Sequence, residues 1–463
     1  MRALYRHPAL LPRRTEHELR YALNFARLTS FQPGAAAKGA RSGRADVEVA
    51  NGPLLSFRGQ VLEHFPKIFD GAASPGHKLK ESLQLMDRLA PVLRDARRRT
   101  LEHHARDFSP KELDEEVGIK TLVSVAGGGG GAGYVYIGAY EVLDAAELVP
   151  GYVIGSSIGA VIGLFRARKK IHDLPGDIAL AKSLQLDQVF RFVSFKAKYG
   201  LPGLMRLFLH AGIGKRFTKP DGSRFRLPDL EIPYEAVVAG VWRGALKGSP
   251  EEYARVHHLE ANSKPSGLAL SRRVAGQLVR MVGFFNPMIV KEIPVGADEL
   301  TGAFDCVDAA GFSAAVPGIL HYDIAREDPH MAAILAELFR REEIACLIDG
   351  GVANNVPVRT AWHQVQMGKI GTRNCYFLGF DCFHPQWSLG HIPLQGISRV
   401  IQLQVALNRP YAHQILQFKP TLSPMNLLPK PAEIDQAVQW GRRQMAAEIP
   451  ILHKFFEPVK WYD

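Results

Sequence analysis

Short apolar runs alternate with a helical pattern in the middle of the chain. Thr121–Ala126 and Tyr152–Ile154 are rich in apolar residues and short enough to be buried strands. Tyr134–Leu143, which lies between them, carries the longer apolar pattern of a helix, and Cys375–Phe380 is a further expected strand. Strands that alternate with helices are typical of a parallel sheet covered by helices. We therefore predict a three-layer α/β/α fold with a mainly parallel central sheet.

Helical patterns dominate both ends of the chain. Residues 16–25 and 78–106 repeat apolar side chains at helical spacing near the start, and residues 397–406 and 433–448 do so near the end. Each of these four segments is predicted to be a helix.

These patterns divide the chain into three expected regions. They are an N-terminal helical extension (1–117), a central α/β domain (118–390) and a C-terminal helical segment (391–463) that packs on the central domain. Residues 32–46 are rich in Gly, Ala and basic residues, which predicts a linker or mobile loop, and residues 410–431 are predicted to be a proline-punctuated connector.

Basic charge is concentrated in one segment. The formal net charge is +11, which favours anionic partners such as phospholipid or nucleic acid. Residues 166–226 contain fourteen Lys or Arg against four Asp and no Glu, interleaved with aromatic and aliphatic side chains. This mixture suits an interfacial, lid-like segment on an anionic membrane. Two core helices with a solvated basic face would explain it equally well, and no nucleic-acid motif accompanies the charge.

The chain shows no pattern for membrane insertion or export. Its longest apolar stretch, Tyr152–Phe165, is too short to span a bilayer, and the first residues lack a continuous hydrophobic region. We expect a cytoplasmic protein with at most peripheral membrane contact. The four cysteines have no CxxC spacing and are expected to be reduced core thiols: Cys306, Cys346, Cys375 and Cys382.

A serine turn follows the second strand. Gly155-Ser156-Ser157-Ile158-Gly159 has the GxSxG pattern, in which a tight strand-to-helix turn exposes a nucleophilic serine. The residues two before and two after the serine must be small, and Gly155 and Gly159 meet this need for Ser157 but not for Ser156. Ser157 is therefore the candidate nucleophile. A buried Gly-Ser turn without chemistry is the alternative.

A glycine-rich loop precedes the first helix. Gly127–Gly131 and Gly133 follow the strand directly, and such glycines can expose backbone N–H groups to an oxyanion. The spacing also fits a dinucleotide fingerprint, but the acidic residue expected about 20 positions later is absent. The serine turn favours the oxyanion hole over this fingerprint and over a flexible loop. The candidate donors are Gly128, Gly129, Gly130, Gly131 and Gly133.

Asp349 ends a third apolar run and is followed by Gly350 and Gly351. A carboxylate in a dry pocket can accept a serine proton directly if its pKa is raised. Asp349 is far from Ser157 in the sequence, so only the fold could bring the two together. The alternative to a role as proton acceptor is an Asx-turn, in which Asp349 only shapes the loop. No His, Cys, Asp or Glu cluster has metal-ligand spacing, so we expect no metal and no other cofactor.

The glycine loop, the GxSxG serine and the Asp-Gly-Gly aspartate, in this order, resemble the patatin-like phospholipase family. The small-residue stretch Ser313–Gly318 and the strand Ile232–Val241 resemble further family segments, as do Asn355 and Pro357 after the aspartate. The resemblance covers about residues 118–390. One position departs from the pattern, because Ala132 stands where the family usually has Lys or Arg.

The resemblance implies a serine lipid acyl hydrolase with a Ser157–Asp349 dyad and an acyl-enzyme. Its expected substrates are phospholipids, lysophospholipids or glycerides. Two alternatives stay open. One is a catalytically weak lipid- or protein-binding module, which Ala132 makes plausible. The other is a Ser-His-Asp esterase that uses one of four downstream histidines: His363, His384, His391 or His413.

Overall fold

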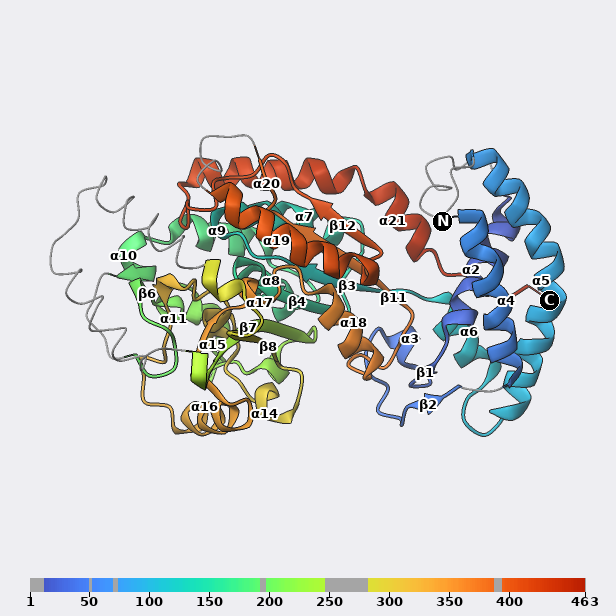
Figure 1. Cartoon of the computed structure of the whole chain (residues 1–463), viewed down its shortest axis with the longest axis horizontal. Coiled ribbons are helices and arrows are strands. Elements are labelled where there is room, and N and C mark those ends of the chain that lie inside the picture. The colour runs from blue at the N-terminus through green and yellow to red at the C-terminus, as the bar shows by residue number, and fades with distance from the viewer. Residues whose placement is uncertain are drawn as a thin grey trace. The chain divides into compact units, whose positions relative to one another are not determined.

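The structure is a computed structural model that describes residues 12–49, 52–69, 74–191, 197–245, 282–386 and 394–462. Its residues form two compact units. The first comprises residues 1–122, 363–376 and 447–463, and the second comprises residues 123–362 and 377–446. The C-terminal segment is thus divided between the two units, and the region boundaries expected at residues 118 and 391 stay predictions. Figure 1 follows the chain through both units.

The first unit is mainly helical. Buried Leu19, Phe25, Phe57, Leu89 and Leu113 share one apolar core. Among the described residues its helices include α2 (Arg13–Arg27), α4 (Gly52–Phe69), α5 (Pro75–His103), α6 (Pro110–Gly118) and α21 (Ile449–Phe456). The two predicted N-terminal helices are confirmed as α2 and α5.

The segment predicted to be a linker or mobile loop, residues 32–46, consists mostly of turns and loops, and the prediction is corrected only where the segment is helical. It contains the short helix α3 (Ala35–Lys38), and the strands β1 (Ser30–Phe31) and β2 (Val47–Glu48) pair on either side of it. Gly34 and Gly39 have positive φ angles of 81° and 59° and bound the helix, so these glycines set its ends rather than supply flexibility.

The second unit contains the central sheet. Its seven strands lie in the order β10-β7-β4-β3-β11-β12, and β8 also pairs with β7. Helices surround this mostly parallel sheet, so the predicted three-layer α/β/α fold is confirmed. The strands are β3 (Thr121–Ala126), β4 (Tyr152–Ser156), β7 (Tyr234–Trp242), β8 (Val290–Val295), β10 (Ile344–Asp349), β11 (Cys375–Asp381) and β12 (Gln414–Gln417). β12 lies inside the segment predicted to be a connector, which corrects that prediction.

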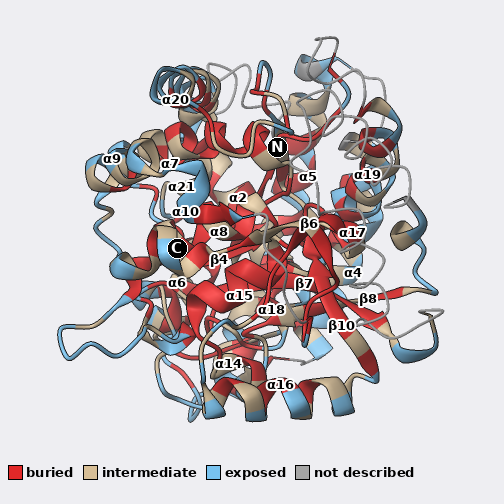
Figure 2. Ribbon diagram, turned by 90° about the vertical axis from the view of Figure 1, so that its left-hand side faces the viewer, coloured by how far each residue is buried: buried red, intermediate tan, exposed pale blue. Residues whose placement is uncertain are grey.

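Helices follow the strands that carry the motifs. α7 (Val135–Ala145) and α20 (Pro431–Ala446) approach closely, since a Cβ built on Gly441 would overlap the Val135 carbonyl group. α8 (Ile158–Arg168) follows the serine turn, and α17 (Gly350–Ala353) and α18 (Val358–Gln366) follow Asp349. α19 (Gln395–Asn408) and α20 confirm the two predicted C-terminal helices. Figure 2 shows a largely buried interior, with the exposed residues concentrated toward the surface.

Strand β7 brings two distant segments together. β4 runs parallel to β7 and ends with Ser156 opposite Val237, whereas β10 runs antiparallel to β7 and ends with Asp349 opposite Val238. The carboxyl ends of β4 and β10 therefore meet beside neighbouring residues of β7.

The basic segment 166–226 folds into short elements, and six of its thirteen described basic side chains form ion pairs. The elements include α9 (Leu174–Ser183), α10 (Leu186–Val189), α11 (Leu209–Ile213) and the strands β5 (Phe190–Arg191) and β6 (Gly203–Leu207), which belong to a small sheet with β9 (Gly318–His321). Arg166, Arg168, Lys182, Arg216, Lys219 and Arg224 form ion pairs with Asp144, Asp173, Asp177, Asp229, Asp328 and Asp435. Phe192, Phe195 and Lys196 lie outside the described residues.

No helix in the described parts of the chain combines the length and the apolar character needed to cross a bilayer. All four cysteines are buried free thiols, as expected.

Candidate active site

Ser157 occupies a strained turn between β4 and α8. Its φ and ψ angles are 54° and −128°, a conformation that non-glycine residues rarely adopt. The flanking glycines allow this turn, because a Cβ on Gly155 would lie 2.5 Å from the Gly159 carbonyl carbon and one on Gly159 would lie 2.6 Å from the Gly127 oxygen. The neighbouring Ser156 donates its hydroxyl proton to the Asn354 carbonyl at 2.7 Å. The two adjacent serines therefore differ as their flanking residues predict: Ser157 occupies the tight turn, and the Ser156 hydroxyl is hydrogen-bonded within the protein.

Ser313 holds the backbone of Ser157 in place. Its hydroxyl oxygen accepts a hydrogen bond from the Ser157 N–H at 2.9 Å and donates its proton to the Val237 carbonyl at 2.5 Å. Two residues later, the Ala315 carbonyl accepts a hydrogen bond from the Asp349 N–H at 2.9 Å. The small-residue stretch 313–318 thus contacts both candidate residues, a role that the sequence analysis did not assign.

Replacing Ser313 by alanine is expected to lower kcat/KM about tenfold and to lower Tm. The Ser157 N–H would lose its partner in a buried site, which costs ~1–3 kcal/mol and releases the strained turn. Ser124→Ala is the matched control, since Ser124 is equally buried and its hydroxyl bonds to Tyr140. Equal loss of activity in both variants, after correction for folded protein, would remove Ser313 from the site.

Asp349 is buried at the end of β10 beside Ser157. Its Oδ1 accepts a hydrogen bond from the Gly351 N–H at 2.7 Å, and its buried Oδ2 has no partner of ordinary geometry among the described residues. Burial raises the pKa of Asp349 to about 7. The nearby Ser157 hydroxyl and the Gly351 N–H oppose this rise in pKa. The carboxylate is therefore a base whose pKa is close to neutral pH.

The glycine loop lies against the serine. A Cβ built on Gly128 would lie 2.9 Å from the Ser157 Cβ, and Gly130 has a positive φ of 53°. The N–H groups of Gly127, Gly128 and Gly131 donate to backbone carbonyls. Within the described part of the chain, no partner of the Gly129 or Gly130 N–H group is found. These two groups are therefore the available donors.

The remaining motif glycines serve close packing. Gly133 packs against Ile158 of α8, and Gly350 packs against the Val237 carbonyl. A Cβ built on Gly133 would overlap the Ile158 side chain, and one built on Gly350 would overlap the Val237 oxygen. The buried Cys382 thiol donates to the Gly128 carbonyl at 3.5 Å and fixes the loop from behind. Together with the Gly128 N–H, which donates to the Asn355 carbonyl at 3.3 Å, this contact leaves the loop little freedom.

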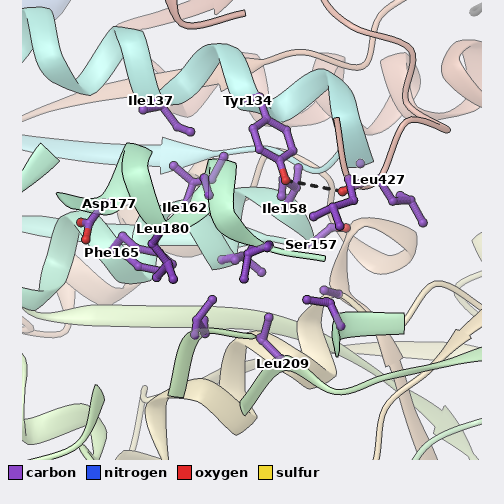
Figure 3. A pocket seen from close by; sticks show the side chains of 18 of the residues that line it. Tyr134, Ile137, Ser157, Ile158, Ile162, Phe165, Asp177, Leu180, Leu209 and Leu427 are labelled. Carbon is purple, nitrogen blue, oxygen red and sulfur yellow. Dashed lines mark hydrogen bonds between the residues drawn. The ribbon is translucent and has the colours of Figure 1, made fainter. Parts of the chain in front are cut away.

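Two apolar cavities meet at Ser157. The first has a volume of about 140 Å³ and extends between α8, α9 and α11. Figure 3 shows Ser157 among its lining residues, with Asp177 at the end away from Leu427. Its aliphatic and aromatic lining includes Ile158, Ile162, Phe165, Leu180, Leu184, Leu209 and Ile213.

The second cavity lies on the Asp349 side of Ser157 and is smaller, at about 80 Å³. Gly128, Gly129 and Gly130 line it together with Ser157 and Asp349. Its apolar lining includes Ile319, Val352, Phe383, Leu394, Ile397, Ile401 and Met425. The candidate nucleophile, the candidate base and the glycine loop thus line one cavity.

Neither cavity has a described Lys or Arg in its lining. Ala132, which stands where the family usually has a basic residue, is fully buried. Within the described residues, an anionic group at Ser157 would therefore rely on backbone N–H groups.

One histidine outside the four candidates lines the first cavity. His172 has its Nδ1 at 3.0 Å from an Asp144 oxygen and its Nε2 at 3.3 Å from an Asp177 oxygen. Burial lowers the pKa of His172, but the two carboxylates outweigh burial and raise the pKa above its ordinary value. Both ring nitrogens are thus engaged by carboxylates.

The four candidate histidines lie elsewhere. His363, His384 and His413 line neither cavity, and His391 lies outside the described residues. His384 bonds to the Phe418 carbonyl at 2.9 Å, and His413 accepts a hydrogen bond from the Phe377 N–H at 3.1 Å. The described part of the chain has one group with metal-ligand geometry, His210, Asp305 and Asp308, and Arg326 already donates to both carboxylates.

The fold and the site define a class, namely three-layer α/β/α proteins with a serine at a strand-to-helix turn. A family model for the patatin-like phospholipases matches residues 124–362, which is more than half of the chain. The chain therefore belongs to the patatin-like phospholipase family, which confirms the resemblance. The match associates it with lipid acyl hydrolases and with lipids as the general class of substrate. No curated protein matches the chain.

Proposed function

We propose that this protein is a serine lipid acyl hydrolase that works through a Ser157–Asp349 dyad. One observation carries the proposal. The ends of β4 and β10 meet beside β7, so that a serine on a strained turn and a buried carboxylate with a pKa of about 7 line one cavity. Family membership supports a lipid ester as the substrate.

The reaction begins with attack of the Ser157 hydroxyl oxygen on the ester carbonyl carbon. Asp349 accepts the hydroxyl proton as the new C–O bond forms, and its unpaired Oδ2 is the oxygen available for this transfer. The tetrahedral intermediate then expels the alcohol, which takes the proton from Asp349. Water attacks the acyl-enzyme, Asp349 again accepts a proton, and the fatty acid leaves while Ser157 regains its hydrogen.

The oxyanion is held by backbone groups. Gly129 and Gly130 supply the N–H donors without a partner among the described residues, and the contacts of Gly127, Gly128 and Gly131 fix the loop around them. The N-terminus of the eleven-residue helix α8 adds a positive dipole beside Ser157. These donors stand in place before the substrate arrives, so little reorganisation is needed.

The preferred substrate is apolar on both sides of the scissile ester. The larger cavity suits the acyl chain, and the smaller cavity suits an apolar part of the leaving group. Neither cavity offers a described Lys or Arg to a phosphate, and both ring nitrogens of His172 already lie beside carboxylates. Glycerides and diacyl lipids should therefore be better substrates than lysophospholipids.

A lipid-hydrolysis panel with wild type and Ser157→Ala tests the proposal. It should contain a diglyceride, a diacyl phospholipid and a lysophospholipid, and released fatty acid is the readout. Hydrolysis by wild type alone, in the order diglyceride, diacyl phospholipid, lysophospholipid, is the expected result. Lipid binding without turnover in wild type would instead identify a binding module.

The dyad predicts that no histidine is essential. His363, His384, His391 and His413 changed singly to Gln should each keep most of the activity, and His172→Gln should do so as well. The carboxylates of Asp144 and Asp177 already engage both ring nitrogens of His172, so it has no free acceptor for the Ser157 proton. A folded variant that loses about three orders of magnitude in kcat would place the protein in the triad class.

A further inference from the structure

Helix α19 has an inner face that belongs to the candidate site. Ile397 and Ile401 line the cavity that holds Asp349. Gln404 donates from its side-chain nitrogen to the Val352 carbonyl at 2.6 Å, and its side-chain oxygen accepts from the Asn355 N–H at 3.2 Å. These contacts fix which side of the helix faces the protein.

The outer face of α19 is apolar and exposed. The side chains of Leu403 and Leu407, one helical turn apart, are 68% and 73% exposed, and the exposed Ala406 lies between them. Figure 2 colours exposed positions along α19 pale blue. Burying such leucines in water-excluding surroundings is favourable, so adjacent exposed leucines indicate a contact surface.

The charged residues of the segment that forms this face have one sign. Arg399 and Arg409 are exposed at its two ends, and the segment 394–410 contains no Asp or Glu. Apolar side chains flanked by basic ones complement a surface with anionic groups over an apolar interior.

We propose that the outer face of α19, defined by Arg399, Leu403, Ala406, Leu407 and Arg409, docks on an anionic lipid surface. The choice of a lipid partner rests on the proposed function, because the cavity behind this helix would hold the lipid ester. Docking here would bring the membrane to the helix whose other side lines the Asp349 cavity. The outer face of α19 would then contact the membrane from which the lipid is taken, and its inner face would line the cavity in which the ester is hydrolysed.

The basic segment 166–226 is the competing surface, and its structure supports it less well. Six of its thirteen described basic side chains are paired with carboxylates, four of which lie outside the segment, so part of its excess charge is neutralised within the protein. It still exposes Ile171 and Leu186, at 89% and 57%. Ile171 and Leu186 are therefore suitable control positions for Leu403 and Leu407, because their side chains are about as exposed but lie in the competing segment.

The experiment compares the double variant Leu403→Ser/Leu407→Ser with the control Ile171→Ser/Leu186→Ser. Co-sedimentation uses vesicles of equal parts phosphatidylcholine and phosphatidylserine, and vesicles of phosphatidylcholine alone. The α19 variant should bind the anionic vesicles at least about tenfold more weakly than wild type, and the control should bind like wild type. Arg399→Gln/Arg409→Gln should weaken binding to anionic vesicles about tenfold and make binding less sensitive to salt.

A soluble short-chain ester and circular dichroism are measured on the same preparations. Unchanged soluble-ester turnover beside lost vesicle binding supports docking through α19. Wild-type binding by the α19 variant, lost binding in the control alone, or loss of soluble-ester turnover in a folded α19 variant would each overturn it. Absence of ester turnover in wild type would overturn the proposed hydrolysis and leave the vesicle result to decide the docking surface.

Discussion

Replacing Ser157 by alanine is expected to abolish ester hydrolysis and active-site labelling together. The change removes only the hydroxyl oxygen that would form the acyl-enzyme, and the turn's backbone, held by the Ser313 hydroxyl, stays in place. We expect kcat to fall by ~10⁴ or more, a rise in the activation barrier of about 5 kcal/mol or more. Such a loss without a loss of fold identifies a nucleophile.

Ser156→Ala is the matched control for this prediction. Ser156 precedes Ser157 directly and is fully buried, but its hydroxyl donates to the Asn354 carbonyl. A fluorophosphonate probe should label wild type and Ser156→Ala, and it should leave Ser157→Ala unlabelled. Labelling that survives in Ser157→Ala would show that another residue is the reactive one.

The local parts of the site could be predicted from the sequence because they depend on short-range sterics. A tight strand-to-helix turn needs small residues at fixed offsets, and of the two adjacent serines only Ser157 has glycines at both positions. The buried strands and the helix between them follow from apolar periodicity in the same way. The catalytic roles of these residues remain predictions.

The proximity of Ser157 and Asp349 could not be predicted from local patterns. It depends on the register in which β7 pairs with β4 and with β10. It also depends on the antiparallel direction of β10 in a sheet that is mainly parallel. Family resemblance implied the pairing, but apolar periodicity says nothing about strand direction or order. For the same reason, β12 was not predicted from the sequence, because its four residues form a strand by pairing in parallel with the end of β11.

Long-range side-chain contacts were missed for a similar reason. Ser313 meets the Ser157 N–H, and His172 meets Asp144 and Asp177, only because the fold places them there. The basic count in residues 166–226 was correct, but four of the carboxylates that neutralise it lie outside this segment, at Asp144, Asp229, Asp328 and Asp435. An excess of basic residues in one sequence segment is therefore a weak guide to the surface potential, because the fold can bring carboxylates from other segments beside them.

Replacing Asp349 by asparagine is expected to remove most of the turnover. The amide keeps the oxygen that accepts from the Gly351 N–H, so the turn survives, but it cannot accept the Ser157 proton. Loss of a positioned general base lowers kcat by ~10²–10⁴. Asp381→Asn is the matched control, because Asp381 is also a buried aspartate at the end of a strand and lines neither cavity. Activity of Asp349→Asn within about tenfold of wild type would make Asp349 structural.

The pH dependence follows from the pKa of about 7 that burial gives Asp349. Only the ionised carboxylate can accept the proton, so kcat/KM of wild type should rise about tenfold per pH unit below pH ~7 and level off above it. The pH is varied with a soluble ester, so that vesicle binding does not contribute. A profile that is flat from about pH 5 to about pH 8 would contradict the assignment of Asp349 as the base.

Stability should change in the opposite direction to activity. The pKa of Asp349 is higher in the folded chain than its ordinary value of 3.8, so the folded state binds the proton more tightly. The contribution of Asp349 to the free energy of unfolding is therefore fully present below pH ~4 and is lost as the pH rises through ~7. An amide at this position carries no charge, so Asp349→Asn should be more stable than wild type in urea near pH ~8, and this advantage should shrink toward pH ~5. An advantage that is equal at both pH values would mean that the buried charge of Asp349 is not its source.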